Sequence, residues 1–154
     1  MTKNEWVEVC GHALSAAEIE NFHPLEIADI GRKAPETTLY GHHRLTAPSL
    51  HLIPNAIKLC RVLCDLRAAV RPMPVLVNSW YRDTIYNYRI GGVPRSMHLT
   101  CGAADVTKTG FTPDEVADIL EAHPDRDQFG IGRYKTFTHI DIRGMIGRNS
   151  PARW

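Results

Sequence analysis

Two histidines and two aspartates in the second half of the chain have the types and spacing needed to bind a metal ion. The stretch RSMHLTCGAADV holds His98 and Asp105, and FTHIDIR holds His139 and Asp141. Two imidazoles and one carboxylate, with a fourth position left for water, make up a catalytic zinc site. The same ligand set forms the facial triad of non-haem iron enzymes. These residue types are therefore compatible with a metal site and leave the metal open.

Whether His98 and Asp105 can meet depends on the backbone between them. In a helix their side chains would lie two turns apart, about 11 Å. That is too far for a single ion, whose ligand atoms lie about 2 Å from it. Gly102 allows a chain reversal before a strand that contains Asp105. We expect the reversal to bring both side chains together, with His139 as the third ligand.

The stretch FTHIDIR is predicted to be a strand in which alternate residues share a face. His139 and Asp141 then lie on one face, and the two isoleucines lie on the other. A face with a histidine and an aspartate either lines a site or points to solvent. In the second case His98 forms hydrogen bonds within a loop, and Asp141 pairs with Arg143 or Arg133 at the surface.

Hydrophobic periodicity and capping signals predict the elements that position these residues. A short helix is expected from Ser15, where Glu18 completes a capping-box pattern, and a longer one over residues 49–70. Residues 24–46, which include His42 and His43, are expected to form a loop with both histidines solvated. A third helix follows the capping box TPDE, and the strands are expected at VLVNS, AADVT, FGIGRY and FTHIDIR. This order predicts an α+β fold, with helices packed on a mainly antiparallel sheet.

Length and composition favour one globular domain over residues 1–154, with residues 1–45 as a poorly patterned N-terminal extension. A net charge of +1 gives no electrostatic footprint for nucleic acid. No apolar run has the length of a signal peptide or a membrane span. We therefore expect cytoplasmic synthesis, no membrane insertion and a monomer. Four cysteines are too few and too scattered for a disulfide framework.

The segments SMHLTCGAADV and FTHID resemble the zinc D-Ala-D-Ala carboxypeptidase and murein endopeptidase family. Its wider fold group includes the vancomycin-resistance dipeptidases and the hedgehog signalling domain. The family frame is Ser-x-His-x-x-Gly-x-Ala-x-Asp or close to it, followed by His-x-Asp or His-x-His. Ser96, His98, Gly102, Ala104 and Asp105 occupy this frame, with the glycine one place later than in some members. NSWYRDTIYNYRIGGVPRS resembles the family's upstream element, and the closing ARW is similar to small bacterial and phage members. The resemblance extends from about residue 50 to the C-terminus.

The resemblance implies a peptidase of cell-wall peptides that holds one zinc ion through His98, Asp105 and His139. Arg82 matches the family's arginine that binds the substrate carboxylate or the developing oxyanion. Ser96 matches a residue that hydrogen-bonds the substrate, although it could equally cap the turn. The partners would be peptidoglycan stem peptides. With no signal peptide, the protein would reach the wall after release from the cell or as part of a phage particle.

One departure from the family pattern concerns the general base. Many relatives place an acid three residues before the last histidine ligand, where this chain has Thr136. Asp141 is the local substitute, either as the base or as a group that orients a ligand. A non-catalytic zinc module that binds the cell wall or belongs to a virion is the alternative. An iron-dependent oxygenase is a third hypothesis, although the chain lacks the repeated strands of a double-stranded β-helix. Exo- and endopeptidase activity both remain open.

Overall fold

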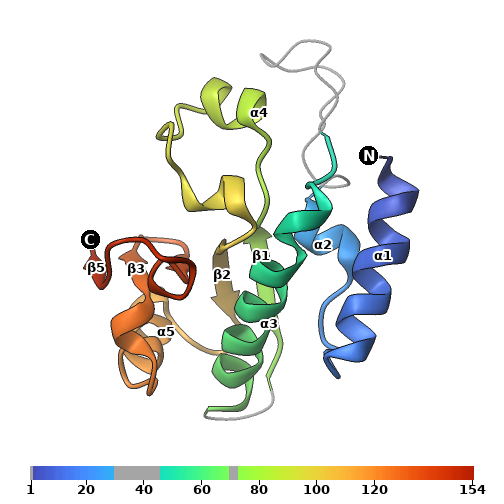
Figure 1. Ribbon diagram of the computed structural model, residues 1–154. Coiled ribbons are helices and arrows are strands. Elements are labelled where there is room, and N and C mark those ends of the chain that lie inside the picture. The colour runs from blue at the N-terminus through green and yellow to red at the C-terminus, as the bar shows by residue number, and fades with distance from the viewer. Residues whose placement is uncertain (1, 30–45, 70–72) are drawn as a thin grey trace.

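The computed structural model describes residues 2–29, 46–69 and 73–154 of the chain. Figure 1 shows the element order, with α1 and α2 at one end of the molecule and β5 at the other. The α-helices are α1 (Lys3–Ala16), α2 (Pro24–Ala28), α3 (Ile53–Ala68), α4 (Thr84–Arg89) and α5 (Pro113–Glu121). The strands are β1 (Val75–Ser79), β2 (Ala103–Lys108), β3 (Gly130–Arg133), β4 (Thr138–Asp141) and β5 (Ala152–Arg153).

The five strands form one sheet in the order β1-β2-β4-β3-β5. Every neighbouring pair is antiparallel except β3 and β5, which are parallel. The predicted α+β class with a mainly antiparallel sheet is therefore confirmed, as is the hairpin formed by β3 and β4. Strand β5 was not expected, because a two-residue strand leaves no periodic pattern in the sequence.

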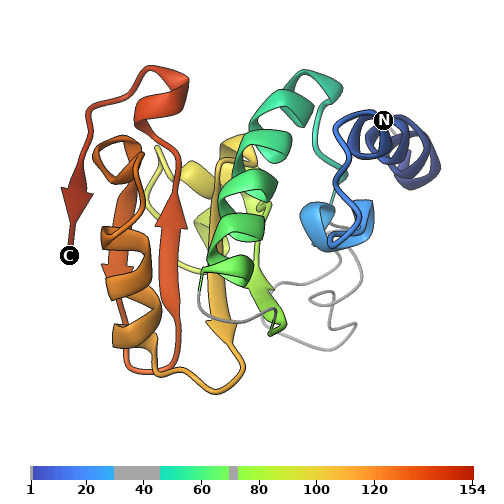
Figure 2. The same cartoon turned by 90° about the horizontal axis from the view of Figure 1, so that it is seen from below.

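Helices α3 and α5 cover one face of the sheet (Figure 2). Val106 and Ile140 point into the core on this side, together with Leu59 and Leu63 of α3 and Leu120 of α5. Because strand residues alternate between faces, Asp105 and His139 point to the opposite face. Burial of one face by apolar side chains therefore fixes where the polar face lies.

Helix α1 begins well before the predicted helix. Thr2 is the N-cap, and its capping box with Glu5 has the same pattern as Ser15 and Glu18. The apolar spacing decides between the two, because residues four apart share a helix face and Trp6, Cys10 and Leu14 are all buried. The predicted start at Ser15 is therefore wrong, since this residue lies in the last turn.

Helix α2 corrects the predicted loop over residues 24–46. Pro24 occupies the first helical position and His23 is the N-cap, which is a favoured arrangement for a helix start. The sequence signal was missed because histidine is an unusual N-cap. His42 and His43 lie outside the described residues. The buried side chains of α1, with Ile27 and Ala28 of α2, belong to the same hydrophobic cluster as those of the sheet.

No helix in the described part of the chain is both long and apolar enough to cross a membrane.

Candidate metal centre

Two of the predicted ligands are brought together by strand register. Asp105 of β2 lies directly opposite His139 of β4, and opposed residues in an antiparallel pair face the same side. Their side chains meet with His139 Nδ1 2.8 Å from Asp105 Oδ1. Both residues are buried.

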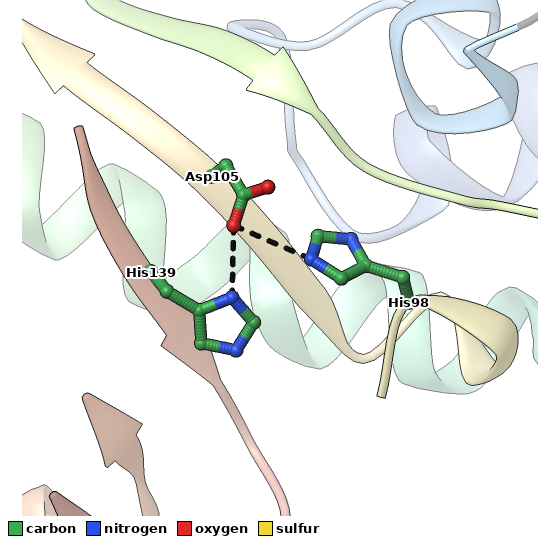
Figure 3. Close-up of side chains that lie close together, drawn as sticks. All are labelled: His98, Asp105 and His139. Carbon is green, nitrogen blue, oxygen red and sulfur yellow. Dashed lines mark hydrogen bonds and ion pairs between the residues drawn. The ribbon is translucent and has the colours of Figure 1, made fainter. Parts of the chain in front are cut away.

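His98 reaches the same carboxylate from the short 3₁₀ helix Met97–Thr100. Its Nε2 atom lies 3.3 Å from Asp105 Oδ1. Figure 3 shows both imidazole rings directed at this one oxygen. The three side chains that the sequence selected therefore form one cluster.

The chain reversal between His98 and Asp105 is made by Cys101 and not, as predicted, by Gly102. Cys101 adopts a left-handed conformation with φ of 55°, which is uncommon for a residue with a Cβ. Gly102 instead provides room, because a Cβ there would lie 2.9 Å from the Thr100 Oγ1 atom. The sequence placed the turn correctly but assigned it to the wrong residue.

The cluster has the donor set and spacing of a zinc site. One ligand atom from each of the three residues can be chosen so that all lie within 4.8 Å of one another. Ligand atoms about 2.0–2.2 Å from a tetrahedral zinc are separated by about 3.4 Å, close to the distances at Asp105 Oδ1. Within the described ranges, no other group of histidine, cysteine, aspartate and glutamate residues meets this criterion. His98, Asp105 and His139 thus fit the ion that their chemistry implies.

Hydrogen bonds behind the histidines fix which ring nitrogen faces the centre. His98 Nδ1 contacts the carbonyl oxygen of Trp80, which can only accept, so this nitrogen carries the proton and Nε2 is left to act as a ligand. His139 Nε2 lies 3.2 Å from Asp141 Oδ2. Asp141 accepts that proton and leaves Nδ1 directed at the centre. Such outer contacts orient metal-binding histidines in general.

Asp141 is fully buried and is held by Arg143 in a two-point contact. Arg143 Nε lies 2.9 Å from Oδ1 and Arg143 Nη2 lies 2.7 Å from Oδ2. The pairing with Arg143 was considered as a surface contact, but the structure places it behind His139. Gly130, opposite Asp141 in β3, gives it space, since a Cβ there would lie 2.4 Å from Asp141 Oδ2.

Burial and charge pairing have opposite effects on the pKa values of Asp105 and His139. Burial alone would raise the pKa of Asp105, but hydrogen bonds to His139 and His98 hold it well below its usual range. Burial likewise opposes the charge on His139, yet contacts with Asp105 and Asp141 raise its pKa. Burial lowers the pKa of His98. Asp105 and Asp141 therefore favour the charged form of His139 against the effect of burial.

The other predicted site residues surround this cluster. Arg82 Nη2 lies 2.6 Å from Asp105 Oδ2 and Arg82 Nε lies 3.2 Å from Ser79 Oγ, so Arg82 pairs with a predicted ligand. The Ser96 hydroxyl accepts a hydrogen bond from the backbone of His98 and caps its short helix. Thr136 is exposed in the turn between β3 and β4.

A cavity of about 380 Å³ opens over the cluster. One part of its wall is formed by Arg82 and by residues of the segment 92–98 that follows α4. Another part is aromatic. From the sequence, Trp154 was noted only as part of the closing ARW, and it was not predicted to line the site with Tyr134 and Phe137. The lining includes Arg82, Val93, Arg95, Ser96, Tyr134, Phe137, Arg143 and Trp154.

A family model described as peptidase M15 matches residues 21–141. The chain belongs to the M15 peptidase family. The resemblance to zinc D-Ala-D-Ala carboxypeptidases is thereby confirmed, and membership implies a metallopeptidase. The match begins about thirty residues earlier than the motifs indicated, so α2 belongs to the family region. No match was found among curated proteins.

Proposed function

We propose that this M15 member is a zinc-dependent peptidase that hydrolyses D-amino-acid-containing bonds of peptidoglycan. The convergence of His98, Asp105 and His139 beneath an open cavity carries the proposal. Zinc bound there would supply Lewis acidity toward a carbonyl oxygen and a water acidic enough to react near neutral pH. The remaining roles belong to side chains of the chain itself.

Arg82 is proposed to bind the substrate carboxylate or the developing oxyanion. Its Nε and Nη2 atoms contact Ser79 and Asp105, which fixes the plane of the guanidinium. Its Nη1 atom has no hydrogen-bond partner among the described residues, and the side chain lines the cavity. A fixed guanidinium edge suits a carboxylate or an oxyanion. Ser96, on the same wall, is proposed to hydrogen-bond the substrate.

Asp141 is proposed to orient His139 and not to act as the general base. Both of its oxygens already accept hydrogen bonds, from Arg143 and from His139. Arg143 keeps it charged, since pairing holds the pKa of Asp141 well below its usual range although burial opposes this. A carboxylate with so low a pKa is a weak proton acceptor.

Digestion of purified peptidoglycan by the zinc-loaded protein tests the function. Mass spectrometry should detect free D-alanine from a carboxypeptidase or split cross-links and cut stems from an endopeptidase. A chelator should abolish either product, and so should His139→Ala, which should also lose zinc. His123→Ala is the matched control, because His123 pairs with Asp65 away from the centre. Turnover that survives in His139→Ala contradicts the proposal.

A second candidate is a non-catalytic zinc module that binds the cell wall or belongs to a virion. Thr136 favours it, because this position is exposed and carries no acid. Zinc bound at one ion per chain, with binding to peptidoglycan but no new amino groups, would support this candidate over the peptidase.

A further inference from the structure

The last residue of the sequence, Trp154, forms part of the cavity wall beside His139. Their ring centroids lie 5.2 Å apart. Trp154 is 49% exposed, so its indole packs against the site on one face and leaves much of its surface open. An aromatic surface of this kind at a cavity edge is available to a ligand.

Four contacts hold the Trp154 backbone and indole in place. Its backbone N–H donates to Ile131 at 3.2 Å, and its carbonyl accepts from Arg133 at 2.8 Å. Its indole Nε1 donates to the Tyr134 hydroxyl at 2.9 Å. The guanidinium carbon of Arg143 lies 5.2 Å from the indole ring, within the range of a cation–π contact. The indole is therefore fixed before any ligand arrives.

Strand β3 makes room for this arrangement at Gly132. A Cβ on Gly132 would lie 2.6 Å from Trp154 Nε1 and 3.0 Å from Tyr134 Cε2. Tyr134 also stacks on Phe137 with ring centroids 4.4 Å apart. We name Tyr134, Phe137 and Trp154 the aromatic wall, and all three line the cavity.

The strand order places the aromatic wall and Arg82 on opposite sides of the centre. Arg82 follows β1 at one edge of the sheet, Trp154 follows β5 at the other, and β2 and β4 with the ligands lie between them. The side chains converge on the centre, because Arg82 Nη2 lies 2.6 Å from Asp105 Oδ2 and the Trp154 ring lies 5.2 Å from that of His139. A peptide held by Arg82 on one side of the centre would therefore meet the aromatic wall where it extends past the ligands.

We propose that Trp154, with Tyr134 and Phe137, is a specificity-determining residue that binds the aliphatic surface of substrate residues on the far side of the scissile bond from Arg82. The inference rests on the proposed function. The preferred substrate is then a stem peptide that extends beyond the cleaved bond, in preference to a free dipeptide. Aliphatic groups pack favourably on aromatic faces, which present a large apolar area with little loss of side-chain freedom.

The kinetic test compares the stem pentapeptide L-Ala-D-Glu-L-Lys-D-Ala-D-Ala with the dipeptide D-Ala-D-Ala. Trp154→Ala should lower kcat/KM for the pentapeptide by about tenfold or more, and the dipeptide value by a much smaller factor. Trp154→Phe should recover most of the loss. Tyr88→Ala is the control, because Tyr88 is 83% exposed and does not line the cavity. An equal loss on both peptides, or reduced zinc content in Trp154→Ala, overturns the proposal.

A binding test separates this proposal from the proposed function. Trp6 and Trp80 are fully buried, so quenching of tryptophan fluorescence by acrylamide reports Trp154. The pentapeptide should protect Trp154 from acrylamide in the zinc-loaded protein, and the dipeptide should not. Protection without any cleavage would support the aromatic wall while the peptidase proposal fails. Cleavage or binding of the pentapeptide with Trp154 unprotected would overturn the aromatic wall alone.

Discussion

Asp141 is the residue whose two possible roles can be separated by one substitution. Asp141→Asn keeps an oxygen for His139 Nε2 but removes the charge that Arg143 contacts. If Asp141 orients the ligand, zinc affinity should fall by about 10–100-fold, as measured by competition with a coloured chelator. Asp127→Asn, at an exposed acid that does not line the cavity, should leave affinity unchanged.

A different outcome for Asp141→Asn would identify it as the general base. Zinc affinity would then stay constant, while kcat at saturating zinc would fall by about 10²–10⁴-fold. The two roles therefore differ in the quantity that changes, and both can be measured on the same preparation.

At the residue scale, the sequence predicted the members of the cluster but not the contacts that hold their side chains in place. His98, Asp105 and His139 were found because metal chemistry needs few residue types at limited spacings. The contact between His98 and the Trp80 carbonyl could not be predicted, because every residue has a carbonyl and only the fold selects one. The burial of Asp141 behind His139 could not be predicted either, because the strand pattern fits a solvent-facing strand equally well.

At the scale of elements, the glycines of β3 leave room for side chains that pack against this strand. Gly130→Ala would place a Cβ within 2.7 Å of Asp141 and Arg143 atoms, and neither side chain can move without breaking a buried pair. We expect the free energy of unfolding in urea to fall by about 1–3 kcal/mol, with weaker zinc binding. An Ala variant as stable as the parent would contradict the role assigned to Gly130.

Gly11→Ala is the matched control for that substitution and should act in the opposite direction. Gly11 lies inside α1, where a Cβ would meet Pro24 at an ordinary 3.8 Å. Alanine is favoured over glycine in a helix by about 0.5–1 kcal/mol. The same urea titration should therefore show a small gain in stability and no change in zinc affinity.

Elements with strong apolar periodicity were predicted well, and those without it were not. The helix over residues 49–70 appears as a short 3₁₀ turn followed by α3, and VLVNS is β1. The pattern at α1 was misassigned because two capping boxes compete, and only the buried spacing of Trp6 and Cys10 decides between them. Helix α2 and strand β5 are too short for periodicity to register. Tertiary contacts define them.

For the whole molecule, zinc should stabilise the folded state, because the ligand set is assembled only by folding. Saturation at a hundredfold excess over Kd should add about 2.7 kcal/mol to the free energy of unfolding. Thermal unfolding with zinc and with a chelator measures this difference. His98→Ala should abolish the shift, whereas a shift that persists in the variant would mean that zinc binds elsewhere.

Trp80 contacts both the hydrophobic core and the candidate metal centre. Its carbonyl contacts His98, its indole donates to Cys101 at the reversal, and its ring packs edge-on against Phe22 at 5.6 Å. Phe22 is therefore linked to a ligand more than seventy positions away through one intervening residue. Repacking around Phe22 is therefore expected to change zinc affinity without any change to the ligands.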